Sequence, residues 1–449
     1  MLNKNLLPLL SFVVIVAALT LNLQAAPDSA LNRHKRVTEK VKVVSQVMSS
    51  VVNLNTERIL DSQKKGDREG TYISQSWGYS LGSGSIISGN GLILTNAHVV
   101  DRAIRINANI NEKIRADAQL VAIDRVNDLA LLKVNLPEAI TLTPIKMGEV
   151  GDLLLGEDVI ALGNPYGLGS SISHGILSAV GRQVSVDNKI LFTDVLQTDA
   201  PVFPGSSGGP LINMNGEMIG ITSSIFGDEQ RIGFAIPLQR AQNVMARWLI
   251  PERFSPVSLG IIPAVKRLAN GDMIFYINDI LIDSPAQAAG LKNGDVIVAV
   301  NDRPVGDLLD LSLKLCEMRS GQTLRLTLNN ERKVNLKVKS INIDNWRSDG
   351  KKRFGFSTQF MTENIAKNLN YPFYNMIIIS DLDVNSPPDI KRGDILLQIG
   401  DIAINGIDDF SLATRIYQPG DEVQLTLLEI TTDKDDKKIY IKKETNLKL

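Results

Sequence analysis

Gly205-Ser206-Ser207-Gly208-Gly209-Pro210 is the stretch of sequence that decides the fold. Glycines at 205 and 208 allow a tight turn in which backbone N–H groups converge on one point, where larger side chains would crowd the approach. The flanking prolines and strand-like runs favour an ordered turn over a flexible Gly/Ser linker. We assign an oxyanion hole to Gly205, Ser206 and Ser207, with the N–H groups of Gly205 and Ser207 as donors.

Two earlier segments supply what a serine nucleophile needs. They are Thr95-Asn96-Ala97-His98-Val99-Val100 and Asn127-Asp128-Leu129-Ala130-Leu131-Leu132. A serine hydroxyl requires a base, and the base requires a buried carboxylate that fixes its tautomer. Taken singly, His98 is typical of a structural histidine and Asp128 of a turn residue. The order His, Asp, Ser favours a chymotrypsin-like triad over the subtilisin and α/β-hydrolase orders.

Length and composition describe a soluble globular protein of several domains. The chain has 449 residues, 44% hydrophobic and 22% charged, which predicts about three domains. A net charge of −1 gives no support for nucleic-acid binding. The single cysteine, Cys316, excludes an intramolecular disulfide. Neither metal-ligand spacing nor a phosphate-binding Gly-rich Lys motif occurs, so we expect no metal, ATP or other cofactor.

The first residues are typical of an export signal. Lys4 precedes a largely apolar run over residues 6–21, and Gln24-Ala25-Ala26 offers small residues for cleavage. We predict a signal peptide over residues 1–25. The alternative is a retained membrane anchor, but about 16 apolar residues span only ~24 Å of a ~30 Å hydrocarbon core.

Short alternating strands and turn signals fill residues 37–249 and predict a barrel or sandwich. Asn90-Gly91 and Asn215-Gly216 predict type I′ hairpins, in which both turn residues have positive φ. The charged stretch from Thr56 to Ser76 predicts an inserted loop.

An internal repeat occupies the second half of the chain. Gly294-Asp295-Val296-Ile297 recurs as Gly393-Asp394-Ile395-Leu396, an offset of 99 residues (393 − 294). The segment starting at Gly321 recurs from Gly420 with the same offset. The repeat predicts a duplicated domain, and the polar stretch over residues 344–352 predicts a linker between the copies.

These segments together resemble the HtrA/Deg serine proteases. The resemblance runs from about residue 37 to the end and rests on residues 95–100, 127–134, 197–210 and 231–237. It implies a mainly β fold, with a two-barrel chymotrypsin-like protease domain over residues 37–249. Two small α+β PDZ domains would follow, over residues 256–341 and 353–449. It also implies His98 as the base, Asp128 as the residue that orients it, and Ser207 as the nucleophile.

Two positions depart from the family pattern, which usually has asparagine where this chain has Phe203 and Ser206. Ser206 is a second hydroxyl in the turn, so the identity of the nucleophile rests on register with Gly208-Gly209-Pro210. The bulkier Phe203 can alter the conformation of the turn. Neither change removes a triad member, and we expect an active enzyme. The alternative is a chaperone or scaffold with a latent or inactive protease site.

Substrate is expected to pair with an edge strand by β-augmentation. The absence of acidic residues around this strand predicts a neutral pocket and cleavage after small or medium aliphatic residues. The alternative interpretation is that these residues form an ordinary core strand with no role in substrate binding. The residues assigned to substrate binding are Thr222, Ser223, Ser224, Ile232 and Phe234.

Each repeat carries a segment that resembles the carboxylate-binding loop of PDZ domains, in which N–H groups around a glycine capture a peptide's terminal carboxylate. The second copy lacks the Ala-Gly-Leu turn present at Ala289 to Leu291, so we expect it to serve mainly in assembly. The assigned residues are Leu259, Gly260, Ile261, Phe354, Gly355 and Phe356.

The resemblance implies an exported, periplasmic, ATP-independent serine endopeptidase that degrades misfolded or unfolded envelope proteins. Its PDZ domains would capture C-terminal peptides and regulate activity, and the chain would assemble as a homotrimer or a larger cage.

Overall fold

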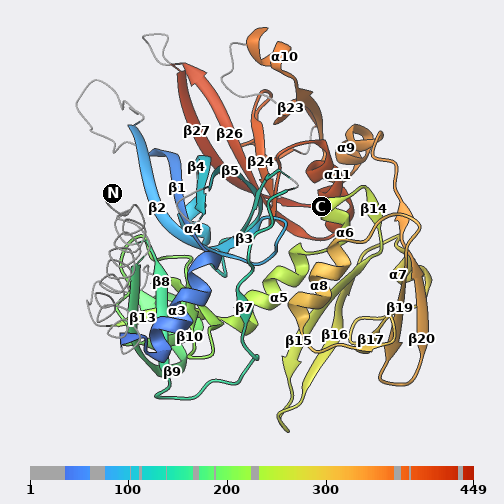
Figure 1. Cartoon of the computed structure of the whole chain (residues 1–449). Coiled ribbons are helices and arrows are strands. Elements are labelled where there is room, and N and C mark those ends of the chain that lie inside the picture. The colour runs from blue at the N-terminus through green and yellow to red at the C-terminus, as the bar shows by residue number, and fades with distance from the viewer. Residues whose placement is uncertain are drawn as a thin grey trace, which may run out of the picture.

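The computed structural model describes residues 36–60, 76–101, 103–110, 114–137, 139–164, 171–186, 189–223, 232–368, 376–383, 386–432 and 438–449 (Figure 1). The predicted signal peptide lies outside these residues. So does most of the predicted charged loop: β1 continues to Leu60 and β2 begins at Ser76, which leaves residues 61–75 outside the description. Among the described residues, no helix is long and apolar enough to cross a membrane.

The first barrel is a closed antiparallel sheet in the order β5-β4-β1-β2-β3-β6, with β6 pairing back to β5. The helix α3 (Glu39–Val47) and the 3-10 turn η1 (Met48–Ser50) lead into it, and α4 (Ala97–Val100) follows β3. Its strands are β1 (Val51–Leu60), β2 (Ser76–Ile86), β3 (Leu92–Thr95), β4 (Ala103–Ile110), β5 (Ile114–Asp124) and β6 (Leu129–Val134).

The second barrel closes in the order β8-β9-β10-β13-β12-β11, with β11 returning to β8 and β7 added to β12. Its chain leaves through α5 (Leu238–Trp248) and α6 (Pro251–Phe254). Its strands are β7 (Lys146–Met147), β8 (Asp158–Gly163), β9 (Ser171–Val186), β10 (Lys189–Thr198), β11 (Pro210–Ile212), β12 (Glu217–Ser223) and β13 (Gly233–Pro237).

Both predicted Asn-Gly hairpins form, but the turn type differs from the prediction. Only the glycines adopt positive φ, 97° at Gly91 and 75° at Gly216, and neither asparagine does. Gly91 N–H donates to Ser88 O, and Gly216 N–H donates to Asn213 O. Each connection is therefore longer than two residues and ends in a left-handed glycine, as in a three- to five-residue hairpin loop.

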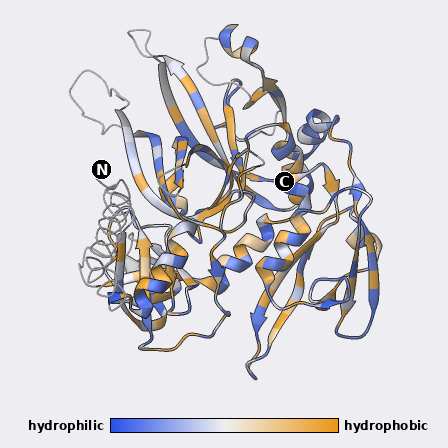
Figure 2. Cartoon of the chain, in the orientation of Figure 1, coloured by the Kyte–Doolittle hydropathy of each residue, from blue (hydrophilic) through white to orange (hydrophobic). Residues whose placement is uncertain are grey.

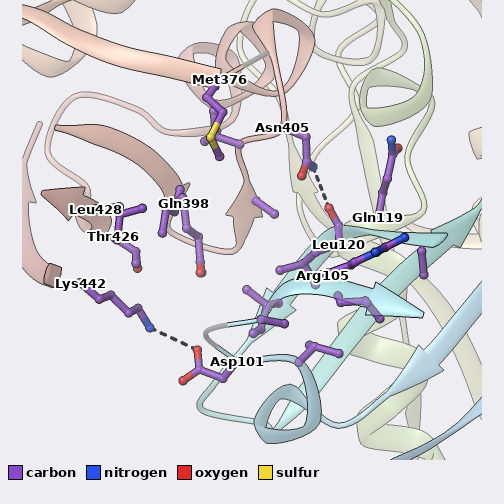
Figure 3. A pocket seen from close by; sticks show the side chains of 18 of the residues that line it. Asp101, Arg105, Gln119, Leu120, Met376, Gln398, Asn405, Thr426, Leu428 and Lys442 are labelled. Carbon is purple, nitrogen blue, oxygen red and sulfur yellow. Dashed lines mark hydrogen bonds and ion pairs between the residues drawn. The ribbon is translucent and has the colours of Figure 1, made fainter. Parts of the chain in front are cut away.

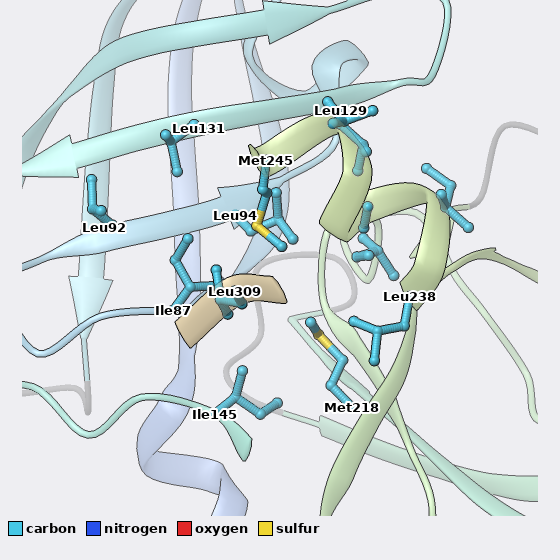
Figure 4. Packing of buried hydrophobic residues seen from close by; sticks show 14 of the residues in the cluster. Ile87, Leu92, Leu94, Leu129, Leu131, Ile145, Met218, Leu238, Met245 and Leu309 are labelled. Atoms are coloured by element: carbon cyan, nitrogen blue, oxygen red, sulfur yellow. The ribbon is translucent and has the colours of Figure 1, made fainter. Parts of the chain in front are cut away.

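One buried apolar cluster joins the two barrels (Figure 4). Leu94 and Leu129 come from the first barrel, Met218 from the second, Met245 from α5 and Leu309 from a later helix. Because Leu94 directly precedes the His98 segment and Leu129 directly follows Asp128, this cluster fixes those segments at the junction of the barrels. Figure 2 shows the alternation of apolar and polar residues along the strands, as expected for sheets with one buried face.

The third unit has a six-stranded sheet, a separate two-stranded sheet formed by its first and last strands, and two helices. Its elements are β14 (Val257–Ser258), β15 (Ile261–Arg267), β16 (Met273–Ile280), α7 (Pro285–Ala288), β17 (Val296–Val300), β18 (Arg303–Pro304), α8 (Leu308–Cys316), β19 (Thr323–Leu328), β20 (Lys333–Lys337) and β21 (Lys339–Ser340).

The fourth unit repeats the order of the strands from β15 onward, but its short helix α10 lies between its first two strands, whereas α7 follows the second strand of the third unit. Its elements are α9 (Trp346–Phe354), β22 (Phe356–Met361), α10 (Glu363–Asn368), β23 (Met376–Leu382), β24 (Ile395–Ile399), β25 (Ile402–Ala403), α11 (Ile407–Ile416), β26 (Glu422–Thr432) and β27 (Lys438–Lys448).

The polar stretch predicted as a linker between the copies is instead the helix α9. Trp346 stands edge-on to Phe410 of α11, with ring centroids 5.8 Å apart, and Phe354 lies 5.6 Å from the same ring. Burial of these two aromatic residues holds an otherwise charged segment as a packed helix.

The fourth unit docks on the first barrel. β25 pairs with β5 through Ile402 and Ala122, so the two sheets form one continuous twelve-stranded sheet. Asn405 Nδ2 donates to Leu120 O at 2.7 Å beside this pair. The docking therefore covers an edge of the first barrel.

Candidate active site

His98 and Asp128 meet at the junction of the barrels. His98 Nδ1 lies 2.9 Å from both carboxylate oxygens of Asp128. Because a carboxylate only accepts hydrogen bonds, Nδ1 is the protonated nitrogen and Nε2 is left as the base. The backbone N–H of His98 also donates to Asp128 Oδ1, at 3.0 Å. The carboxylate is buried, whereas the His98 side chain is 29% exposed, so the base can reach a substrate.

Asp128 has a left-handed backbone, with φ of 53°. A non-glycine residue in this region costs roughly 1 kcal/mol or more and persists only where the surroundings hold it. Asn96 Nδ2 donates to Asp128 O at 2.9 Å, and Asn127 N–H donates to Asp124 Oδ1 at 2.9 Å. These bonds fix the turn that aims the carboxylate at His98.

The serine segment is held as a sharp turn. Ser206 N–H donates to Phe203 O at 2.9 Å, and φ is 98° at Gly205. Proline at the second position and left-handed glycine at the third are the requirements of a type II turn. Phe203, although bulkier than the family's usual asparagine, is 37% exposed and accepts the bond that closes the turn.

Ser83 ties this turn to the first barrel. Its hydroxyl donates to Gly205 O at 2.8 Å, and its N–H donates to Ser207 O at 2.8 Å. A Cβ at Gly208, where φ is 86°, would lie 2.2 Å from Thr95 Oγ1. Ser207 is thus held against the end of β3, three residues before His98.

Ser206, the competing hydroxyl, points elsewhere. A Cβ added to Gly163 of β8 would meet Ser206 Cα at 2.6 Å and Oγ at 3.1 Å. Ser206 therefore packs on the wall of the second barrel. This placement favours Ser207 as the nucleophile.

Ser223 is a partner of Asp128 that sequence reasoning assigned to substrate binding. Its hydroxyl lies 3.4 Å from Asp128 Oδ2 and is buried. The contact joins positions 95 residues apart, and only the packing of the two barrels against each other creates it. No local sequence signal predicts it.

Thr222 does not fit its predicted role in substrate pairing. Its N–H donates to Gly209 O at 2.9 Å, and its carbonyl accepts from Gly208 N–H at 2.9 Å. Its hydroxyl donates to Ser206 O and Gly209 O. All its polar groups are therefore used to hold the serine turn.

The other residues predicted to bind substrate are Ser224, Ile232 and Phe234, which in sequence lie next to the end of β12 or in and beside β13. Ile232 and Phe234 are half-buried, and Phe234 packs against Val184 and Val195 inside the second barrel. Ser224 lies outside the described residues.

The first predicted carboxylate loop already holds a carboxylate. The N–H groups of Leu259 and Gly260 both donate to Oε1 of Glu252, at 2.5 and 2.7 Å. Gly260 has a φ of 88°, and Ile261 begins β15 as a buried residue. The two N–H groups converge as a carboxylate nest does.

The second predicted loop is not a nest, which corrects the assignment of Phe354, Gly355 and Phe356. Phe354 is the last residue of α9, and Gly355 is its left-handed C-cap, with φ of 73°. Gly355 N–H donates to Lys351 O, so helix capping uses this group. Phe356 is fully buried at the start of β22.

A separate cavity of about 420 Å³ lies where the fourth unit docks on the first barrel (Figure 3). Arg125 and Lys442 both donate to Asp101 Oδ1 there, at 2.8 and 3.3 Å. Burial alone would raise the pKa of Asp101, but Lys442 and Arg125 together hold it below its usual value. These charges are paired with one another, and no group of three or more metal-ligating side chains occurs among the described residues.

The fold and this site define a two-barrel, chymotrypsin-like serine protease followed by a PDZ unit and a fourth unit of similar strand order. The trypsin-like peptidase domain family matches residues 82–221, and the PDZ domain family matches residues 258–342. The chain belongs to the HtrA/Deg family of serine proteases.

Three relatives illustrate this membership. The putative serine protease HhoA of Synechocystis is 32% identical over 67% of this chain and 84% of its own length. The periplasmic serine endoprotease DegP of Salmonella typhimurium is 32% identical over 71% of this chain and 68% of its own length. A probable periplasmic DegP-like serine endoprotease of Halomonas elongata is 29% identical over 88% of this chain and 94% of its own length.

Proposed function

We propose that this chain is an exported serine endopeptidase that hydrolyses unfolded proteins in the periplasm without ATP. Several relatives are named periplasmic serine endoproteases, which supports the reaction and the compartment. The observation that carries the assignment is the buried Asp128 bonded to His98 Nδ1, with the Ser207 turn tied to the same barrel.

The proposed reaction follows from these positions. Ser207 Oγ attacks the substrate carbonyl while His98 Nε2 takes its proton, and Asp128 stabilises the imidazolium that results. The N–H groups of Gly205 and Ser207 stabilise the oxyanion, where one lost donor costs about 3–4 kcal/mol. His98 then protonates the leaving amine, and water attacks the acyl-enzyme by the same route.

Partners are proposed from the PDZ match and the family. The first PDZ unit takes C-terminal peptides, since its nest holds a carboxylate. The pocket beside Ile232 takes small or medium aliphatic side chains. The chain assembles as a homotrimer or a larger cage. The fourth unit serves this assembly rather than peptide capture, because a helix C-cap occupies the position where a carboxylate-binding nest was predicted.

A fluorophosphonate probe tests the nucleophile and separates the enzyme from the scaffold. The probe should label the wild-type chain and Ser206→Ala but not Ser207→Ala. Casein should be digested by the first two, with or without a chelator. No labelling of the wild-type chain, even with an activating C-terminal peptide, would establish the scaffold instead.

A further inference from the structure

The helix α5 lies along the open edge of β15 in the first PDZ unit (Figure 1). Within the described residues, β15 pairs with β16 on one side only. On its other side, Val265 N–H donates to Asn243 Oδ1 at 3.0 Å, and Asn243 Nδ2 donates to Val265 O at 3.2 Å. One side chain of α5 thus makes the pair of bonds that an extended peptide would make with this strand.

Apolar side chains of the same segment fill the space between β15 and α8. Ala246 shares a buried cluster with Val265 and Leu308. Ile250 is fully buried against Ile262 and Leu281. A peptide lying between this strand and this helix would need the volume that these side chains occupy.

Glu252 of the same segment occupies the carboxylate-binding nest formed by Leu259 and Gly260. Its Oε1 accepts from Leu259 and Gly260, and the residue is 3% exposed. Its Oε2 has no hydrogen-bond partner within the described residues. Burial raises the pKa of Glu252, while the N–H bonds and Arg415 of the fourth unit oppose that rise. A carboxylate held with one oxygen unsatisfied is strained, and a better-bonded carboxylate can replace it.

We propose that residues 243–252 are a built-in ligand of the first PDZ unit. Asn243 replaces the peptide backbone, Ile250 replaces an apolar side chain, and Glu252 replaces the terminal carboxylate. A C-terminal peptide binds only when this segment withdraws. The proposal rests on the proposed function, in which this unit takes C-terminal peptides.

Withdrawal also has a route to the active site. α5 follows β13 without a break, since β13 ends at Pro237 and α5 begins at Leu238. β13 pairs with β12 through Phe234 and Ser223, and Ser223 contacts Asp128. Peptide binding is therefore coupled through one strand pair to the carboxylate of the site.

Peptide affinity tests this inference in the full chain carrying Ser207→Ala, which prevents digestion. A fluorescent peptide with an apolar C-terminal residue is titrated, and anisotropy is measured. Glu252→Ala removes the acceptor of both N–H groups and should bind at least about ten times more tightly, because apparent affinity scales with the open fraction. Asn243→Ala should act in the same direction. Glu39→Ala, which removes an exposed charge on α3, should leave affinity unchanged, and a peptide with an amidated C-terminus should bind none of them.

Hydrogen exchange gives a second readout that needs no peptide. The amides of Leu259 and Gly260 should exchange slowly in the parent chain and at least about ten times faster in Glu252→Ala, which has no side-chain acceptor for them. Equal affinity of parent and both variants would overturn the proposal. Absence of binding by every variant would also overturn it. In that case, digestion of casein by the chain with Ser207 intact would show that the proteolytic function survives without it.

Discussion

At the scale of single residues, the site depends on a carboxylate held in a conformation that few side chains tolerate. Asp128 has positive φ and receives hydrogen bonds from His98 and Ser223. Asparagine also tolerates the left-handed region. The geometry of this turn can therefore be kept while its charge is removed.

Asp128→Asn should lower kcat by about 10⁴-fold, because a neutral amide favours the wrong tautomer of His98. The measurement is kcat on an unfolded protein substrate, with circular dichroism to verify the fold. Asp117→Asn changes an exposed carboxylate and should leave kcat unaltered. A loss of less than tenfold in Asp128→Asn would contradict the triad.

Cys316 should not react with thiol reagents in the folded chain. It is buried in α8, and burial raises its pKa from 9.0 to about 12. At pH 8 the thiol is then protonated, and thiolate forms only as the pH rises toward that value. A chromogenic disulfide reagent should detect no thiol at pH 8 until guanidinium is added. Rapid labelling of the native chain would contradict this placement.

At the scale of elements, α9 shows why a charged segment can be a packed helix. Trp346, Gly350 and Phe354 are its buried residues and lie four positions apart, which is the spacing of one helix face. A Cβ at Gly350 would lie 2.2 Å from the Phe410 ring. Glycine is therefore required for the close contact between α9 and α11.

Gly350→Ala should lower the free energy of unfolding of the fourth unit by about 1–3 kcal/mol through overpacking. Chemical unfolding followed by tryptophan fluorescence would measure this change. The matched control is Gly306→Ala, where an added Cβ meets nothing within 4 Å. An effect of equal size in the two variants would argue against the packing of α9.

The sequence was sufficient to predict the strands and the two-barrel class. It was not sufficient to predict elements and contacts that depend on residues far away in the chain. The apolar alternation around Asn90-Gly91 is local, and its hairpin formed. The polarity of residues 344–352 concealed α9, because the partner ring of Phe410 comes more than fifty positions later. Glu252 is an ordinary acidic residue in the first turn of the short helix α6 until folding returns the chain to Leu259. Ser223 likewise meets Asp128 only because the two barrels pack against each other.

At the scale of the whole molecule, Asp401 joins three parts of the chain. Its carbonyl accepts from Ile123 N–H of β5 at 3.3 Å. Its carboxylate accepts from Trp248 Nε1 of α5 at 3.0 Å and from the Tyr417 hydroxyl at 2.6 Å. This partly exposed carboxylate therefore contributes to the docking of the fourth unit, together with the pairing of β25 and β5.

Asp401→Ala should weaken the docking of the fourth unit, because Trp248 Nε1 of α5 loses its acceptor on that unit at about 1–3 kcal/mol. Small-angle scattering should show a larger radius of gyration, and trypsin should cut faster between the two PDZ units. Asp401→Asn keeps a carbonyl acceptor and should show a smaller change. Scattering curves of Asp401→Ala and the parent chain that superimpose would refute this view of the docking.

The pairing of β25 with β5 has a consequence for how the chain is made. Asn405 and Leu120, bonded beside that pair, are 285 positions apart. During synthesis, the early barrel therefore exists for a time with its rim uncovered, and a bare strand rim can recruit other chains. A chain truncated before the last repeat would keep this rim uncovered permanently. The truncated protein should therefore be recovered as aggregates rather than as free protease.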